Sequence, residues 1–401
     1  MKAAAEQTLR LIWNGYQVWN RVLFKGEQPT DTSMDLSLIQ LRAIGMLPSK
    51  TSEESISYTL FNAFMMVSLI AFVASITADL YEASSDIIMF GEDLCVLVGV
   101  YLILLKIFLY RIYKKNIIYI VGEFRSLLNK YSTGSEAIRK IQRQSYIRDI
   151  VIFNTFLILG DFLFVALAFQ PIFSGEPGTL PFRAKYPFSL ENKRTFQAVY
   201  GFQCFCTLIC LKVIIYIDNV GCITIHQTAV NLEILCEKIR EFGKRRMSRE
   251  DLGEIIAHHQ RIIKLIKYVN KYYYYNFVGQ VGASTFLICL TAFEAQIAKD
   301  QPFVALKFQL FMIASFNQLF YWCWVGNQVR FNSLEVAAAA FECEWLTQPP
   351  TFRRDLMFLI LRAQKPLSFR AQPLYGFDFE AFSRILSSSY SVFTMLRTFN
   401  D

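Results

Sequence analysis

The sequence contains little charge, very little histidine and none of the common catalytic motifs. Charged residues make up 18% of the 401-residue chain and only 3 histidines occur, whereas soluble proteins carry about 25% charged residues. There is no Ser-His-Asp arrangement, Walker loop or dinucleotide-binding fingerprint, and no cysteine or carboxylate stands at ligand spacing from His226, His258 or His259. We therefore expect no enzyme activity, no cofactor, no metal site and no nucleic-acid partner.

The sequence also has no secretory signal peptide and no acceptor site for N-glycosylation. The first 19 residues contain no apolar core followed by a small-residue cleavage site, so the first membrane span is expected to act as its own signal. The missing Asn-x-Ser/Thr motif fits a chain with little extracellular polypeptide. The 9 cysteines lie mostly in apolar segments or in loops expected to be cytoplasmic, and we expect buried free thiols.

Long apolar segments are the main feature that is present. Apolar residues make up 54% of the chain, and six segments reach the roughly 20 residues needed to cross a hydrocarbon core of about 30 Å. These six segments cover residues 56–80, 87–112, 150–173, 195–217, 272–298 and 302–326. A weaker seventh segment, 376–399, is diluted by Asp378, Glu380 and Arg384. Because no barrel-like alternation occurs, the sequence predicts an all-α polytopic membrane protein with seven transmembrane helices.

The distribution of lysine and arginine predicts how the chain lies in the bilayer. The N-terminal segment and every second loop carry 30 of these residues, and the alternate set of loops carries 6. Basic loops stay in the cytoplasm, so the N-terminus is expected inside and the C-terminus outside. Apolar residues at helical spacing in 113–148 and 220–270 predict helical cytoplasmic extensions. An aromatic-rich stretch, 9–23, suits an interfacial helix on the inner leaflet.

Two other classes of membrane protein fit the sequence less well. A G-protein-coupled receptor has the opposite orientation and needs basic loops after its first, third and fifth spans. Here loop 81–86 contains no lysine or arginine, and loop 298–301 is short. A transporter would show paired interrupted helices and internal symmetry, and no repeat is visible.

Aromatic and small polar residues in the outer halves of spans two to six form a candidate ligand pocket. A mostly apolar cavity with a few polar groups is typical of sites for small hydrophobic ligands. Membrane-facing and packing phenylalanines are equally common, so both interpretations stay open. The candidate pocket residues are Phe90, Phe156, Gly160, Phe164, Tyr200, Gln203, Phe205, Thr207, Phe286, Phe308, Phe311 and Ser315. The abundance of phenylalanine and tyrosine weakly favours an aromatic ligand.

The last helix has a second candidate function. Residues including Ile385, Ser388, Val392 and Met395 recur at three- and four-residue spacing along it. If helices from several subunits surround an axis, the bulky outer end of this face forms a hydrophobic constriction that gates by dewetting. The alternative is a seventh helix packed in the core of a monomer.

Residues 334–397 resemble the C-terminal signature of the insect odorant receptors. The matching pieces are FECEW at 341–345, RRDLMFLILRAQKPL at 353–367 and SYSVFTMLR at 389–397. The sequence departs from the pattern at Val392, where an aromatic residue is commoner. Length, number of spans and inverted topology agree over the rest of the chain. The related gustatory receptors share the architecture and end in a different motif, and they are the alternative within the superfamily.

The resemblance implies a function and a set of partners. It implies an odorant receptor subunit in the plasma membrane of olfactory sensory neurons, which binds a small volatile odorant in the outer half of its bundle. It also implies a non-selective cation channel, a heteromeric tetramer formed with the odorant receptor co-receptor. The short second cytoplasmic loop indicates a ligand-tuning subunit. In this arrangement residues 1–326 hold the pocket, and 327–401 form a cytoplasmic anchor and the pore helix, with the gate at Val392, Met395, Thr398 and Phe399.

Overall fold

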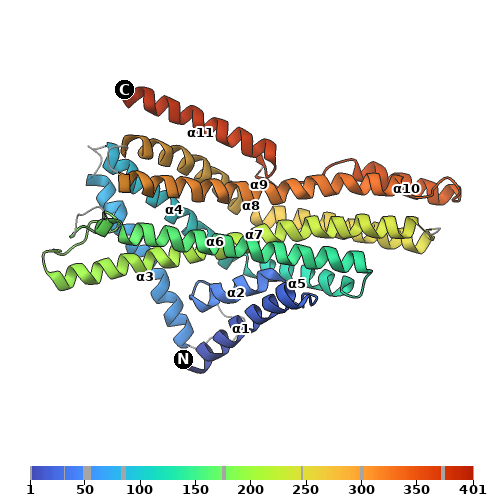
Figure 1. Ribbon diagram of the computed structural model, residues 1–401, viewed down its shortest axis with the longest axis horizontal. Coiled ribbons are helices and arrows are strands. Elements are labelled where there is room, and N and C mark those ends of the chain that lie inside the picture. Colours follow the sequence, from blue (N-terminus) through green and yellow to red (C-terminus); the bar gives the residue numbers. More distant parts are fainter. Residues whose placement is uncertain are drawn as a thin grey trace.

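The computed structural model describes residues 2–30, 32–47, 56–82, 87–173, 178–244, 247–298, 302–371 and 375–400. These residues are almost entirely helical, and most of the helices run along the long axis of the molecule (Figure 1). Among them, six helices are long and apolar enough to cross a membrane. The six are α3 (Ile56–Glu82), α4 (Ile87–Ile112), α6 (Glu136–Phe173), α7 (Lys193–Gly243), α8 (Arg249–Ile297) and α9 (Pro302–Phe341).

Five of the six expected strong spans fall within one of these helices, and the sixth, 272–298, ends one residue beyond α8. The prediction of an all-α polytopic membrane protein is confirmed. The weaker seventh span corresponds to α11 (Phe379–Asn400), whose 22 residues measure about 33 Å at about 1.5 Å per residue. It has the length to cross a bilayer but not the apolar composition of the other six. Glu380 and Arg384, which form an ion pair one turn apart, lower its apolarity.

Several helices continue far beyond the thickness of a membrane. α7 has 51 residues and α8 has 49, so each is more than twice as long as a helix that just spans the hydrocarbon core. A capping box begins α8: the Ser248 hydroxyl accepts from the Asp251 amide at 3.1 Å, and the Asp251 carboxylate accepts from the Ser248 amide at 2.9 Å. With α5 (Lys114–Tyr131) and α10 (Pro350–Ala363), these extensions form a helical region at one end of the molecule (Figure 1).

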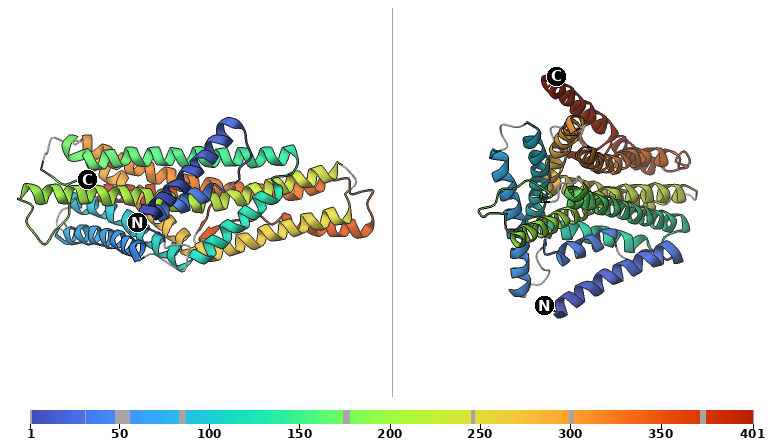
Figure 2. Two further views of the ribbon diagram at one scale, coloured as in Figure 1. Left: turned by 90° about the horizontal axis from the view of Figure 1, so that it is seen from below. Right: turned by 60° about the vertical axis from the view of Figure 1, so that its left-hand side comes forward.

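The N-terminal segment packs against the side of this bundle. It consists of α1 (Lys2–Asn20), the π-helix η1 (Arg21–Lys25) and α2 (Ser33–Ala43). α1 runs obliquely to the long helices (Figure 2). Trp19 is buried, whereas Leu9 and Trp13 are exposed. Asp149 of α6 anchors α2, because its carboxylate accepts from the Ser33 hydroxyl at 2.9 Å and from His226 Nδ1 of α7 at 2.6 Å.

α11 leaves the bundle at an angle and packs mainly against α8 and α9 (Figure 1). A two-stranded antiparallel hairpin, β1 (Arg370–Ala371) and β2 (Tyr375–Gly376), precedes it. Phe377 then packs into the bundle. Its carbonyl oxygen lies so close to Gly326 of α9 that a Cβ on Gly326 would be 2.0 Å from it. Only glycine at 326 permits this approach, so the start of α11 is fixed against α9.

Candidate functional site

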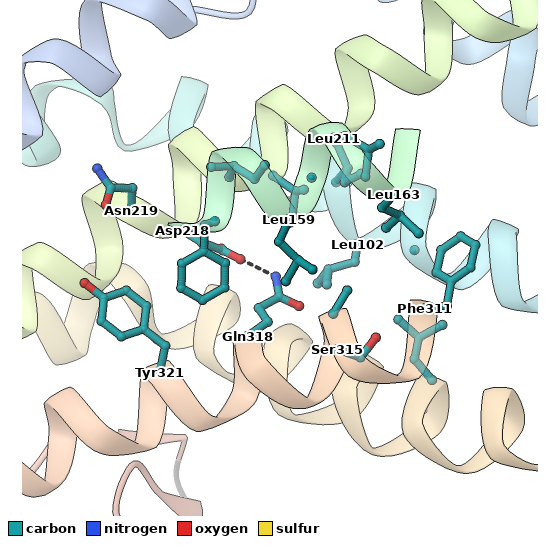
Figure 3. Close-up of a pocket in the computed structure, with 18 of the residues that line it drawn as sticks. Leu102, Leu159, Leu163, Leu211, Asp218, Asn219, Phe311, Ser315, Gln318 and Tyr321 are labelled. Carbon is teal, nitrogen blue, oxygen red and sulfur yellow. Dashed lines mark hydrogen bonds between the residues drawn. The ribbon is translucent and has the colours of Figure 1, made fainter. Parts of the chain in front are cut away.

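A cavity of about 150 Å³ lies inside the bundle, between α4, α6, α7, α8 and α9 (Figure 3). Its wall is largely aliphatic and aromatic, and polar side chains gather toward one end. This composition is typical of sites for small apolar ligands. The lining residues are Gly99, Leu102, Ile103, Phe153, Phe156, Leu159, Gly160, Leu163, Leu211, Ile214, Ile215, Asp218, Asn219, Leu287, Phe311, Ala314, Ser315, Gln318, Tyr321 and Trp322.

The polar end of the cavity is built on a buried ion pair. Asp218 of α7 accepts from the ammonium of Lys106 on α4 and from the side-chain amide of Gln318 on α9 (Figure 3). Lys106 is completely buried and also donates to Gln280 of α8. A buried charge requires a partner because desolvation of an unpaired ion is costly. The pair and its two glutamine partners therefore connect four helices. Because Lys106 neutralises Asp218, this carboxylate adds no net charge to the cavity.

Two hydrogen-bond donors on the wall have no partner among the described residues. The Tyr321 hydroxyl and the Trp322 Nε1 are both buried, and both residues line the cavity. An unsatisfied buried polar atom costs about 1–3 kcal/mol. Both atoms are covered by neighbouring protein atoms, so the small polar group that faces the cavity is the Ser315 side chain (Figure 3).

Four of the twelve residues predicted for the pocket line this cavity: Phe156, Gly160, Phe311 and Ser315. The ring of Phe156 lies 5.4 Å from that of Tyr321. A Cβ on Gly160 would meet the Ile215 side chain at 2.5 Å, so the glycine allows α6 and α7 to approach closely. Ser315 is buried on α9, facing the cavity beside Phe311 (Figure 3).

The other eight predicted residues lie outside the cavity. Four of them are phenylalanines whose rings do not point into it. Phe90, Phe205 and Phe286 are exposed on the outer surface of the bundle, where aromatic residues contact lipid. Phe164 is half-buried on α6 and does not reach the cavity wall. The membrane-facing interpretation therefore accounts for three of the four rings.

The remaining four have structural contacts of their own. Gln203 binds the loop that follows α6, since its side chain accepts from the Phe182 amide and donates to the Phe182 carbonyl, both at 3.0 Å. Tyr200 donates to the Ala168 carbonyl, and Thr207 donates to the carbonyl of Gln203 one turn earlier. Phe308 is buried in a separate apolar cluster with Cys95 and Leu290.

Most residues of the cavity wall were not predicted from the sequence, because the cavity lies deeper than the outer halves of the spans. Leu102, Phe153, Asp218, Gln318 and Trp322 all line it from nearer the middle or the inner end of their spans. The sequence does contain a signal for the depth of the cavity, namely charged residues inside apolar segments. Such residues mark functional sites by default.

The candidate gate residues lie on an exposed face of α11. Val392 is 42% exposed and Met395 is 52% exposed. Thr398 is exposed and donates to the Thr394 carbonyl at 2.9 Å. The side chain of Phe399 lies outside the described residues. A large apolar surface on an isolated chain marks a face that another molecule covers.

Direct packing connects the cavity to the start of α11. Trp322, whose ring forms part of the cavity wall, has its centroid 5.6 Å from that of Phe377. Phe277 of α8 packs on both rings, at 5.8 Å from Trp322 and 4.9 Å from Phe377. Further along α11, Ser389 donates to the Thr285 carbonyl of α8 at 3.1 Å. Ring contacts among Trp322, Phe277 and Phe377 therefore join the cavity wall to the base of α11.

The histidines and cysteines are packed rather than reactive. His258 shares a hydrogen bond of 3.0 Å with the Tyr131 hydroxyl in the helical extension. Burial lowers the pKa of His258 to about 3 and that of His259 to about 4, so both imidazoles are neutral. No group of three potential metal ligands occurs among the described residues. All 9 cysteines are free thiols and 8 of them are buried, as expected.

Comparison with known proteins identifies the family. A family model described as 7tm Odorant receptor matches residues 86–390. Odorant receptor 47b of Drosophila melanogaster is 32% identical over 87% of this chain and 87% of its own length, and Odorant receptor 65a of the same species is 25% identical over 89% and 88%.

The fold has a counterpart among solved structures. The insect olfactory receptor OR5 from Machilis hrabei, solved in complex with eugenol, superposes with a TM-score of 0.78 over 91% of this chain and 97% of that chain, at 15% identity. The apolar cavity, the separate last helix and these matches lead to one conclusion. The chain belongs to the odorant receptor family of insects.

Proposed function

We propose that this chain is the odorant-binding, ligand-tuning subunit of a ligand-gated, non-selective cation channel. One observation carries the proposal: the apolar cavity shares Trp322 with the aromatic cluster that holds the base of α11. Residues 1–326 contain the cavity, and residues 327–401 contain the anchor segment and the pore helix. The role is that of a receptor, without catalysis.

The cavity indicates the kind of odorant. A cavity of about 150 Å³ lined by apolar side chains can hold a molecule of about the size of benzene. The Ser315 side chain on the wall (Figure 3) favours a ligand with one acceptor oxygen, such as an ester, ketone or aldehyde. An organic acid is disfavoured because, among the described residues, no positively charged side chain lines the cavity to balance its carboxylate. We therefore propose a small, neutral, volatile ligand, with an aromatic ring that packs against Phe156 or Phe311 on the wall.

The proposed orientation is N-terminus inside and C-terminus outside, in the plasma membrane of olfactory sensory neurons. The excess of lysine and arginine on one set of loops supports this orientation. The arrangement of the helices also supports it. The end of α11 lies at the same end of the molecule as the loop between α6 and α7, and the helical extensions lie at the opposite end (Figures 1 and 2).

The proposed assembly is a heteromeric tetramer with the odorant receptor co-receptor. Two exposed apolar surfaces support an assembly: the face of α11 that carries Val392 and Met395, and the face of α10 that carries Met357, Phe358 and Leu361. The α11 helices would surround the pore, with the gate near Val392, Met395, Thr398 and Phe399. The α10 region would join the cytoplasmic parts of the subunits.

Gating follows from differential affinity. An odorant that binds the open form more tightly than the closed form shifts the equilibrium by the difference in its two binding free energies. Trp322 and Phe377 are the contacts through which this difference acts on α11.

The test is to express the chain in cells with and without the co-receptor and to record currents during application of neutral volatile esters, ketones and aldehydes. The proposal requires odorant-evoked cation currents that depend on the co-receptor. Expression of both chains at the cell surface with no current to any volatile, or with responses only to non-volatile polar compounds, would contradict it.

A further inference from the structure

A groove of about 650 Å³ lies where the N-terminal segment meets the inner part of α6. Three basic residues of α6, Arg139, Lys140 and Arg143, line it together with Gln144 and Ile147. They recur at three- and four-residue spacing and so share one face of the helix. The opposite wall is formed by Gly26 and Gln28, just after η1. Neither the cavity nor the pore helix uses this groove.

The basic side chains of the groove have no anionic partner in the described part of the chain. Arg139, Lys140 and Arg143 form no ion pair there. The Nε of Arg143 is buried without a hydrogen-bond partner. Glu136 also lines the groove, so the three basic residues leave a net positive charge of about two. An arginine fork held in this way is suited to phosphate oxygens.

A turn of left-handed backbone shapes the other wall. Gly26 ends η1 at φ 72°, and its amide donates to the Arg21 carbonyl. A Cβ on Gly26 would lie 3.3 Å from the Arg143 guanidinium. The backbone therefore approaches the guanidinium closely and orients it. Phe24, two residues earlier, is 82% exposed, which fits a ring in contact with a membrane surface.

The position of the groove along α6 places it at the inner membrane surface. Val151 is an exposed apolar residue at the inner end of the span. At about 1.5 Å per residue, Ile147 lies about 6 Å and Arg143 about 12 Å further toward the cytoplasm. The headgroup layer is ~5–8 Å thick. Arg143 thus lies just past the ordinary headgroups, within reach of phosphates that project beyond them.

We propose that this groove binds an inner-leaflet lipid whose headgroup carries phosphate monoesters, as in a phosphorylated phosphatidylinositol. Arg143 binds one phosphate with its guanidinium, and Arg139 and Lys140 bind the others. Basic pockets at the cytoplasmic ends of membrane helices recognise such headgroups. The proposal rests on the proposed orientation of the chain, and it requires neither odorant binding nor channel activity.

The test uses the purified full-length chain in phosphatidylcholine nanodiscs. Short-chain dioctanoyl phosphatidylinositol bisphosphate is titrated, and the midpoint of thermal unfolding is recorded. We expect saturable stabilisation by this lipid and at least tenfold weaker binding of dioctanoyl phosphatidylinositol, which lacks the monoesters. The variant R139Q/K140Q/R143Q should bind roughly a hundredfold more weakly than the wild type.

A charge-matched control variant, R353Q/K264Q/K267Q, removes three exposed positive charges elsewhere in the helical extensions and should bind like the wild type. R139Q/K140Q, which leaves the half-buried Arg143 in place, guards against misfolding and should show an intermediate loss. Equal binding of the two lipids, or equal weakening by the control variant, would overturn the proposal. Equally tight binding of soluble inositol trisphosphate would overturn the assignment to a lipid. Odorant-evoked currents are not part of the readout, so failure of the proposed function leaves the test interpretable.

Discussion

Filling the internal cavity should weaken odorant binding by an amount that the structure allows us to calculate. Ala314 lies on the cavity wall of α9. Replacing it with leucine adds three carbon atoms to a space of about 150 Å³. The odorant then loses the space for about three of its own carbon atoms. At about 0.8 kcal/mol per buried methylene group, the loss is about 2.4 kcal/mol. This corresponds to a roughly fiftyfold higher half-maximal odorant concentration.

The assay is a dose–response measurement of odorant-evoked current in cells that express Ala314→Leu with the co-receptor. Surface expression is measured in parallel, because an overpacked core can lose stability. Ala198→Leu is the matched control, since Ala198 lines a separate groove of about 620 Å³ between α3 and α7. If Ala198→Leu shifted the dose–response curve and Ala314→Leu did not, the cavity would be the wrong site.

Three further predictions test the coupling, the gate and the buried histidines. Phe377→Leu should keep the odorant dose range and lower the maximal current, because it removes ring contacts without reaching the cavity; a shifted dose range with full current would contradict this role. Met395→Ala or Phe399→Ala should change leak current or gating and leave the ranking of odorants intact, and a changed ranking would refute the gate assignment. Acidification from pH 8 to pH 5 should destabilise the purified chain by about 2 kcal/mol for each of His258 and His259. Their folded pKa values are about 3 and about 4, so only the unfolded chain gains protons as the pH falls through about 6.5. The measurement is the midpoint of thermal unfolding at each pH. The variant His258→Phe should lose about half of the pH dependence that the two histidines cause. An unchanged pH dependence in this variant would contradict the role of His258.

The number and order of the long apolar helices could be predicted from the sequence because hydropathy reports directly on the bilayer. The expected span 87–112 coincides with α4 (Ile87–Ile112). The expected helical extensions were also present, as continuations of α7 and α8. The weak seventh segment corresponds to α11, whose serines and charges lower its apolarity because it packs on the bundle with one face only.

The residues of the cavity were harder to predict because hydropathy does not show which face of an apolar helix points inward. Phe205 and Phe311 look alike in sequence, yet Phe205 is exposed and Phe311 lines the cavity. Gln203 could not be assigned either, since its partner Phe182 lies in a proline-rich loop whose path depends on the tertiary structure. The polar end of the cavity is formed by the pairing of Lys106 with Asp218, residues 112 positions apart in the chain.

The most direct test is a structure of the full-length chain, assembled with the co-receptor and bound to an activating odorant. We predict ligand density between Phe156, Phe311 and Tyr321, with an acceptor oxygen near the Ser315 hydroxyl, and a displaced base of α11 relative to the unbound state. Density in the groove beside Ala198, or a cavity that stays empty while the pore is open, would contradict the claim that this cavity controls the channel.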